Sequence, residues 1–188
     1  MNILLGITGS VAATLTPKLY DGLIAAGHEV KIVATTPALY FIPPDFSVEI
    51  FKDKDEWPVG GYHKNDPVKH IEFRTWADLL LIAPLTANTL AKIANGISDN
   101  FLCCIARAWP KDKPVIVAPA MNTEMWVDPI TLEHIKRLHS IGGVLNKQPR
   151  YLNLFVVNPV SKKLACGDTG MGAMADIETI IKTVNGHV

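Results

Sequence analysis

The sequence predicts an α/β domain with three layers, α/β/α, in which helices cover both faces of a parallel sheet. Four short apolar runs lack the alternation of half-exposed strands and therefore fit strands buried on both faces; they lie at residues 2–7, 30–34, 79–83 and 115–118. Segments with helical spacing separate these runs. Because strands and helices alternate along the chain, we expect a Rossmann-like (flavodoxin-like) sheet with crossover helices.

Helix signals fill the gaps between the apolar runs. Apolar residues at three- and four-residue spacing, bounded by capping residues or glycine, predict helices over residues 15–27, 86–95, 100–109, 128–142 and 176–184. Ser98 is the expected cap of the third helix, and Asp128 with Pro129 marks the start of the fourth. Asp176 is expected to open the last helix.

Two stretches do not fit this alternation of strands and helices. Residues 53–67 are polar, with paired glycines and two prolines, and predict a surface loop. Residues 147–172 have no helical period; their centre, residues 153–160, predicts one arm of a hairpin whose other end carries a glycine-dense segment with a cysteine. We expect residues 1–188 to form a single domain, with this C-terminal hairpin as an insertion.

Composition narrows the class of protein. Lys+Arg and Asp+Glu both total 18, so no overall basic field attracts nucleic acid or an anionic membrane. Hydrophobic residues make up 48% and charged residues only 19%, which suggests burial between subunits. The sequence shows no segment able to span a bilayer. Three cysteines without metal-type spacing predict free thiols and no metal site; we therefore expect a cytoplasmic protein.

The end of the first apolar run predicts a phosphate site. The letters GITGS at residues 6–10 place Gly9 and Ser10 where a strand gives way to a helix, a turn whose N–H groups suit an anion. The second run ends in Thr35 and Thr36, where a dinucleotide fold carries an acid for the ribose. These hydroxyls favour a mononucleotide such as FMN over NAD. A turn that serves only tight packing is the alternative.

Two further candidate segments follow the third and fourth runs. The small and hydrogen-bonding residues after the third run suit a flat ring and its polyol chain; they are Thr86, Ala87, Asn88 and Thr89. A helix cap by Thr86 is the alternative. After the fourth run, Asn122 stands among apolar side chains, where its amide can hold a carboxylate or serve only a turn.

His70 and Cys166 are the candidate reactive side chains. His70 lies on the approach to the third sheet strand, where an imidazole can act as an acid or base; a solvent-facing or capping histidine is the bland alternative. Cys166 lies in the glycine-dense run at residues 165–172. A pliable loop brings such a thiol to a substrate, whereas an incidental turn leaves it without a role.

Four stretches together resemble the homo-oligomeric flavin-containing cysteine decarboxylases. They are GSVAA at 9–13, KHIEFRTWADLLLIAPLTANTLAKIANGISDN at 69–100, PAMNTEMW at 119–126 and LACGDTGMGAM at 164–174. They stand in the family's order along nearly the whole chain. The likeness is greatest to the branch that decarboxylates phosphopantothenoylcysteine in coenzyme A synthesis. Met171 and residues 150–159 depart from the family's pattern around the substrate clamp.

The resemblance implies a role for each matching position. His70 corresponds to the active-site histidine, Asn122 to the asparagine that holds the substrate carboxylate, and Cys166 to the catalytic cysteine. The implied substrate contacts also include Met125, Ala165 and Gly167, with the C-terminal hairpin as the clamp. The implied FMN contacts are Gly9, Ser10, Val11 and Thr35 at the phosphate and Thr86, Ala87, Asn88 and Thr89 at the flavin. Family members are built on trimers, with flavin and substrate between subunits.

Three rival functions share this resemblance. A peptidyl-cysteine decarboxylase releases an enethiol and lacks the loop cysteine, so Cys166 argues against it. In a flavin prenyltransferase, the segment PAMNTEMW at residues 119–126, called the Asn122 motif below, has no role. Relatives that inhibit a protein phosphatase carry long acidic tails, which this sequence lacks. Some bacterial relatives continue into a synthetase, so a stand-alone decarboxylase and a part of such a fusion are both compatible with the chain.

Overall fold

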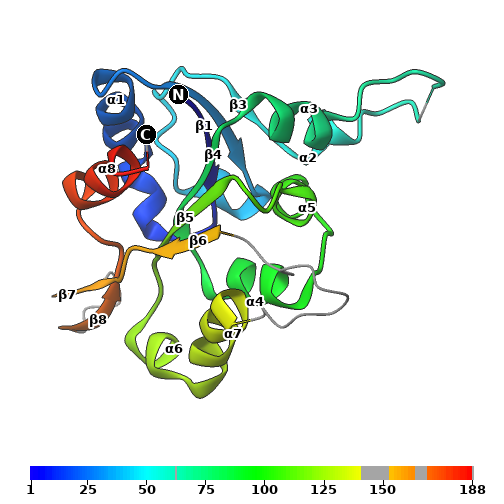
Figure 1. Cartoon of the computed structure of the whole chain (residues 1–188). Coiled ribbons are helices and arrows are strands. Elements are labelled where there is room, and N and C mark those ends of the chain that lie inside the picture. Colours follow the sequence, from blue (N-terminus) through cyan, green and yellow to red (C-terminus); the bar gives the residue numbers. More distant parts are fainter. Residues whose placement is uncertain (62, 141–152, 164–168, 188) are drawn as a thin grey trace.

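A six-stranded parallel sheet forms the centre of the structure (Figure 1). The computed structural model describes residues 1–61, 63–140, 153–163 and 169–187. The strands are ordered β3-β2-β1-β4-β5-β6, and every neighbouring pair is parallel. Their bounds are β1 (Asn2–Ile7), β2 (Glu29–Ala34), β3 (Ile50–Phe51), β4 (Leu79–Leu85), β5 (Pro114–Pro119) and β6 (Asn153–Val156). This is the Rossmann order of doubly wound sheets, as distinct from the flavodoxin order 2-1-3-4-5. The expected Rossmann-like fold is confirmed.

Helices cover both faces of this sheet (Figure 1). One face carries α1 (Thr16–Ala25) and α8 (Ile177–Asn185), and the other carries α3 (Lys69–Trp76), α4 (Ala87–Asn95), α5 (Phe101–Ala108) and α7 (Pro129–Ser140). Short turns follow the ends of β1, β2, β3 and β5; they are η1 (Val11–Leu15), η2 (Thr36–Tyr40), α2 (Asp53–Glu56) and α6 (Thr123–Val127). Among the residues that the structure describes, no helix is long and apolar enough to cross a bilayer.

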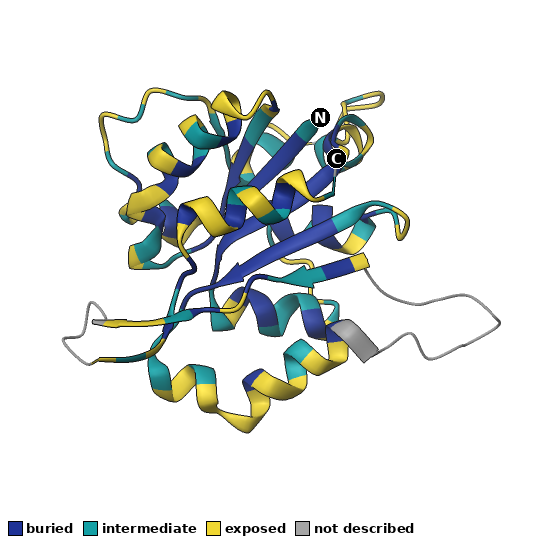
Figure 2. Ribbon diagram, turned by 60° about the vertical axis from the view of Figure 1, so that its left-hand side comes forward, coloured by how far each residue is buried: buried dark blue, intermediate teal, exposed yellow. Residues whose placement is uncertain are grey.

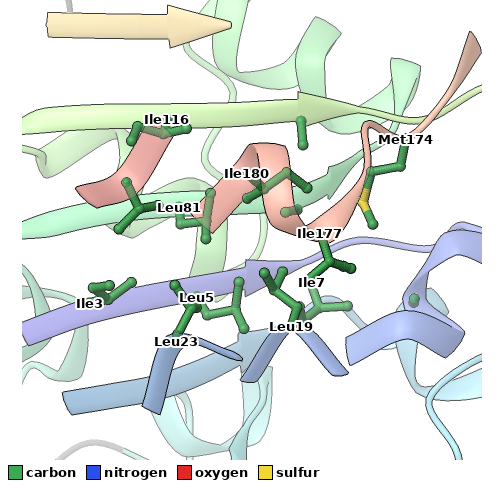
Figure 3. Packing of buried hydrophobic residues seen from close by; sticks show 14 of the residues in the cluster. Ile3, Leu5, Ile7, Leu19, Leu23, Leu81, Ile116, Met174, Ile177 and Ile180 are labelled. Carbon is green, nitrogen blue, oxygen red and sulfur yellow. The ribbon is translucent and has the colours of Figure 1, made fainter. Parts of the chain in front are cut away.

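The central strands β1, β4 and β5 are apolar over nearly their whole length because their two faces meet two separate cores. Leu5 of β1 packs into the cluster that includes Leu19 of α1 and Ile180 of α8 (Figure 3). Leu4, the preceding residue, packs on the opposite face with Phe101 of α5. Each fully buried side chain of this size contributes about 1.5–3 kcal/mol over an exposed position. Figure 2 shows the result as buried strands between helices with exposed outer faces.

Helix starts follow the capping signals, with one correction. Asn100, not Ser98, caps α5, because its Oδ1 accepts a hydrogen bond from a first-turn N–H of that helix at 2.9 Å. Asp128 accepts from a first-turn N–H of α7 at 2.7 Å, as expected. Asp176 precedes α8 but makes no capping bond through its side chain. Its carboxylate instead pairs with Lys162 at 2.5 Å, so it ties the last helix to the preceding hairpin.

The hairpin is shorter than expected and lies later in the chain. Residues 153–156 form β6, which pairs in parallel with β5 and extends the main sheet. The hairpin consists of β7 (Val160–Lys163) and β8 (Thr169–Ala173), which are antiparallel. The prediction of a hairpin arm at 153–160 was therefore wrong for its first half. An apolar run such as Leu154 to Val156 fits a sheet strand as well as a hairpin arm, and only the neighbouring strand decides between them.

Two elements before β4 also differ from expectation. Residues 53–67 begin with the helical turn α2 and are not loop throughout. His70 lies in the first turn of α3, a helix that its sequence pattern did not predict. Phe73 is the one residue of α3 that is fully buried, so the apolar periodicity that marks a helix is weak there.

A buried threonine joins the two central strands where the strand order reverses. Thr8, directly after β1, is fully buried. Its hydroxyl donates to the carbonyl of Pro84 at 2.8 Å and accepts from the N–H of Thr86 at 2.9 Å. One side chain thus fixes the spacing between the turn after β1 and the turn after β4.

Replacing Thr8 by valine is expected to lower the free energy of unfolding by about 1–3 kcal/mol, because a buried carbonyl and N–H lose their partner. Thr8→Ser keeps the hydroxyl and should cost less than about 1.5 kcal/mol, the loss of one methyl group. Chemical denaturation of both variants measures the difference. Equal losses in the two variants would contradict the bridging role.

Candidate active site

A cleft opens at the carboxyl ends of β1, β2 and β4. Its volume is about 250 Å³. One wall carries Gly9 and Thr35, and the facing wall carries Asn88 and Thr89 from the first turn of α4. Further lining comes from Thr36, Pro37, Asp53, Lys92, Asp99 and Asn100. The cleft lies beside the point between β1 and β4 where the strand order reverses, the usual ligand position in such sheets.

The turn after β1 is shaped by packing as well as by its position at the cleft. A Cβ at Gly9 would approach Pro37 Cβ at 2.6 Å, so any larger residue would push η2 away. Ser10 caps η1, because its Oγ accepts from a first-turn N–H at 3.3 Å. Val11 is 48% exposed. The tight-packing interpretation therefore holds for Gly9, which also lines the cleft.

The segment after β4 forms the N-terminus of α4. The side chain of Thr86 caps this helix by accepting from the N–H of Thr89 at 3.4 Å, as the capping alternative predicts. Asn88 and Thr89 line the cleft, whereas Thr86 and Ala87 stand just before them. Thr35, almost fully buried, donates its hydroxyl to the carbonyl of Ile7 at 3.4 Å. The structure thus brings the three predicted cofactor segments together around one opening.

Charged side chains at the rim of the cleft were not predicted from the sequence. Lys92 Nζ lies 2.7 and 2.9 Å from the two carboxylate oxygens of Asp99. This hydrogen bond raises the pKa of Lys92 and lowers the pKa of Asp99, so both groups stay charged at neutral pH. Asp53 accepts from the hydroxyl of Thr36 at 3.1 Å. The remaining donors of the cleft are neutral hydroxyl and amide groups, which suit a phosphate ester and a polyol.

Asn122 lies at the N-terminus of α6, after β5. Its Oδ1 accepts from the N–H of Glu124 at 2.8 Å, so the side chain caps the helix and its orientation is fixed. Met125, one turn further on, is 53% exposed. This hydrogen bond agrees with the interpretation of Asn122 as a turn residue. The same bond holds the amide in one place, as a substrate contact requires.

Two glycines join the Asn122 motif to the strand that follows the cysteine segment. The N–H of Met121 donates to the carbonyl of Gly172 at 2.9 Å. A Cβ at Gly172 would collide with the carbonyl oxygen of Met121, and a Cβ at Gly170 would collide with Thr123. Gly172 is therefore required by the close approach of a neighbouring backbone, and Gly170 by the side chain of Thr123; both glycines lie in a strand. Ala165, Cys166 and Gly167 lie outside the described residues.

His70 is held by a carboxylate from α2. Glu56 Oε1 lies 2.5 Å from His70 Nδ1, and Glu56 Oε2 accepts from the backbone N–H of His70 at 2.8 Å. The Glu56 side chain is only 6% exposed and that of His70 is 25% exposed. The His70 ring is therefore partly buried and fixed at Nδ1. Glu56 was missed because residues 53–67 were predicted to be a loop.

The helices that carry His70 and the Asn122 cap lie far apart in the folded chain. Figure 1 shows α3 near the top of the molecule and α6 at the bottom, beside β7 and β8. A second hollow, of about 730 Å³, is lined by charged residues, Glu56 and Lys69 among them, and by apolar residues that include Trp57 and Val68. One chain thus presents two separate parts of the predicted site.

The cysteines of α5 do not join either part. Cys103 is buried, and burial raises the pKa of its thiol to about 11. Burial, with the nearby Glu56 and Asp53 carboxylates, also raises the pKa of Cys104. Both are therefore poor nucleophiles at neutral pH. Within the described residues, no group of three or more potential metal ligands was found.

Comparisons with known proteins match this arrangement. A family model described as Flavoprotein matches residues 1–188. Phosphopantothenoylcysteine decarboxylase of Mus musculus is 46% identical over 184 residues, covering 97% of this chain and 84% of the mouse protein. Phosphopantothenoylcysteine decarboxylase HAL3 of Malus domestica is 47% identical over 188 residues, covering 97% of this chain and 80% of the apple protein.

Solved structures give the same result. A cysteine-to-serine variant of a PPC decarboxylase, complexed with pantothenoylaminoethenethiol, has a TM-score of 0.84 and 43% identity, covering 98% of this chain and 96% of that one. The FMN binding protein AtHal3 has a TM-score of 0.82 and 43% identity, covering 98% and 94%. The FMN-dependent cysteine decarboxylase SpaF has a TM-score of 0.70 and 26% identity, covering 98% and 97%.

Fold and cleft together define a doubly wound α/β protein with a ligand site at its switch point. The chain belongs to the flavoprotein family, whose model matches it along its entire length. The resemblance to the flavin-containing cysteine decarboxylases is confirmed by relatives that are 46–47% identical.

Gly172→Ala is expected to lower the free energy of unfolding by roughly 2 kcal/mol or more, because φ is +135° and the new Cβ meets a backbone carbonyl. Gly27→Ala is the matched control, since φ is +85° but no atom lies within 4 Å of its Cβ; it should cost about 1 kcal/mol. Thermal and chemical unfolding of both variants measure this. If Gly172→Ala lowered the free energy of unfolding less than Gly27→Ala, that result would contradict the close approach of β8 to the Asn122 motif.

Proposed function

We infer that this chain is an FMN-dependent decarboxylase that converts phosphopantothenoylcysteine to phosphopantetheine and CO₂ in coenzyme A synthesis. One observation carries this inference. The strand that follows Cys166 in sequence is bonded to the backbone beside Asn122 through Gly172. An amide that can hold a carboxylate and a cysteine-bearing segment are thus attached to the same end of the sheet. Relatives named for this activity match 97–98% of the chain.

The residues of the cleft fit FMN. Hydroxyl and amide groups of Thr35, Thr36 and Asn88 line an opening whose acidic side chains already have partners of their own. We propose that the phosphate is held by Gly9, Ser10, Val11 and Thr35, and the flavin by Thr86, Ala87, Asn88 and Thr89. When bound, FMN supplies a two-electron oxidation of the substrate thiol to a thioaldehyde and later returns the same two electrons.

The chain's own residues then account for the carboxylate and the protons. Asn122 holds the substrate carboxylate through its amide, and Met125 contributes an apolar wall. His70 accepts the proton that leaves the substrate sulfur. The thioaldehyde draws electrons from the bond between Cα and the carboxylate, so CO₂ leaves and an enethiolate remains.

Cys166 completes the reaction by proton transfer. The overall change replaces the carboxylate on Cα by hydrogen, so it consumes one proton and leaves no net change in oxidation state. We propose that Cys166 delivers this proton to carbon, with Ala165 and Gly167 as neighbouring substrate contacts. The proton held by His70 returns to sulfur. Closure of the C-terminal hairpin and its connecting segment as a substrate clamp would exclude water during these steps.

We propose that the working unit is a homotrimer or an assembly of trimers, with residues 1–188 as one decarboxylase domain. The helix α3, which carries His70, lies on the opposite side of the molecule from α6, which Asn122 caps (Figure 1), so a neighbouring subunit is needed to bring the two together. Exposed apolar side chains near the Asn122 motif support such an interface; they are Met125, Val127, Ile130 and Leu132. Free thiols at Cys103 and Cys104 support a reducing compartment, which we propose is the cytoplasm.

The flavin-loaded protein is expected to release CO₂ and phosphopantetheine from phosphopantothenoylcysteine, and mass spectrometry measures both products. Cys166→Ser should still release CO₂ but accumulate the enethiol product, lighter by two hydrogens, with phosphopantetheine formation reduced by roughly 100-fold or more. His70→Asn should slow CO₂ release itself by a similar factor. Normal phosphopantetheine formation by Cys166→Ser would remove the proton-donor role. Turnover of a peptide with C-terminal cysteine, but not of phosphopantothenoylcysteine, would overturn the substrate assignment.

Co-expression tests the shared site. Chains carrying His70→Asn and chains carrying Asn122→Asp, each with its own affinity tag, are inactive alone. In trimers purified through both tags, about a third of the sites (one per trimer) should combine an intact His70 with an intact Asn122 from a neighbour and regain activity. Mixed assemblies that stay as inactive as each variant alone would place both residues of a site in one chain.

A further inference from the structure

The carboxylate of Glu56 makes two hydrogen bonds to the same residue. Oε2 accepts from the backbone N–H of His70 at 2.8 Å, and Oε1 lies 2.5 Å from the ring nitrogen Nδ1. The carboxylate is almost completely buried, with 6% of the side chain exposed. A nearly buried carboxylate requires such partners, because an unpaired charge there would be costly.

The helical turn that carries Glu56 is anchored independently of His70. Asp53 Oδ1 accepts from the N–H of Phe101, at the start of α5, at 2.9 Å, and its Oδ2 accepts from Thr36 at 3.1 Å. Asp55 accepts from the N–H of Lys52 at 2.7 Å, which closes the turn on itself. Glu56 is thus presented to α3 from a fixed support.

The hydrogen bond to the Glu56 carboxylate determines which ring nitrogen of His70 carries hydrogen. An ionised carboxylate only accepts hydrogen bonds, so the Nδ1 that faces it must donate. In the neutral ring, the hydrogen is then on Nδ1, and Nε2 has the lone pair. Without Glu56, the two tautomers would compete and the ring would be free to rotate.

We propose that Glu56 is the positioning residue for His70: it fixes the tautomer with hydrogen on Nδ1 and thereby makes Nε2 the atom that takes the proton from the substrate thiol. The statement about the tautomer depends on geometry alone, whereas the proton transfer rests on the proposed decarboxylation. Glu56 touches neither substrate nor cofactor in this assignment and acts only through the ring, as the carboxylate does in other carboxylate–histidine pairs.

A purely structural role is the alternative that an experiment must separate. Val68 at the N-cap of α3 has no side-chain capping bond, and the bond from Glu56 to the N–H of His70 serves that helix end instead. Glu56→Gln separates the two roles. A glutamine amide has one accepting oxygen and one donating nitrogen, so it cannot accept from both His70 N–H groups. If its oxygen caps the helix, its NH₂ faces Nδ1 and favours the opposite tautomer.

The test compares the flavin-loaded wild-type protein, Glu56→Gln and the matched control Asp55→Asn. Asp55 lies on the same turn and accepts from the N–H of Lys52, for which asparagine keeps an accepting oxygen. ¹⁵N NMR of the neutral His70 ring should show hydrogen on Nδ1 in the wild type and the control, and on Nε2 in Glu56→Gln. For phosphopantothenoylcysteine, kcat of Glu56→Gln should fall roughly 100-fold with KM within about threefold, and the control should stay near wild type.

Two results would overturn the proposal. One is a wild-type ring with hydrogen on Nε2, which needs no variant and therefore stands even if Glu56→Gln unfolds. The other is a folded Glu56→Gln protein with the opposite tautomer and unchanged kcat. Failure of the proposed function is distinguishable, because the wild-type protein would then keep hydrogen on Nδ1 but release no CO₂.

Discussion

The hydroxyl of Thr8 is the contact on which the arrangement of the cleft depends. It donates to the carbonyl of Pro84, near the end of β4, and accepts from the N–H of Thr86 just after that strand, so the carboxyl ends of the two central strands are held together. The candidate cofactor residues branch from these turns, with Gly9 after one and Asn88 after the other. In a doubly wound sheet, helices diverge to opposite faces at this point and leave a crevice. A buried hydrogen bond across the crevice determines its width.

The rest of the candidate site divides into two parts within the chain. One part joins the Asn122 motif to β8, where backbone meets backbone at Gly172 without room for a side chain. The other joins Glu56 of α2 to His70 of α3. Each part is rigid by itself, because each is fixed by hydrogen bonds between elements distant in sequence. In the proposed trimer, association of subunits would only dock preformed surfaces, which would keep the entropy cost of assembling the site low.

Features of the fold that depend on local pattern could be predicted from the sequence, and features that depend on distant partners could not. The four apolar runs became β1, β2, β4 and β5, since strands buried on both faces are apolar at every position. The two-residue strand β3 is too short to leave a pattern, and β6 is recognised only through its pairing with β5. Asn100 was passed over as a cap because Ser98 is an equally good capping residue by type, and helix phase alone decides between them.

The candidate site shows the same limit. Gly9, Thr35 and Asn88 could be placed at strand ends, so their convergence followed from the topology. Glu56 could not be found, because its partner lies 14 residues away beyond a polar stretch that has no periodic pattern. One consequence concerns how this part of the chain tolerates change in length. Asp53 lines the cofactor cleft and Glu56 holds His70, one helical turn later. Insertions are therefore tolerated only after Glu56, where the chain loops outward, since a single residue added within the turn would rotate the histidine's support away from it while leaving the cleft intact.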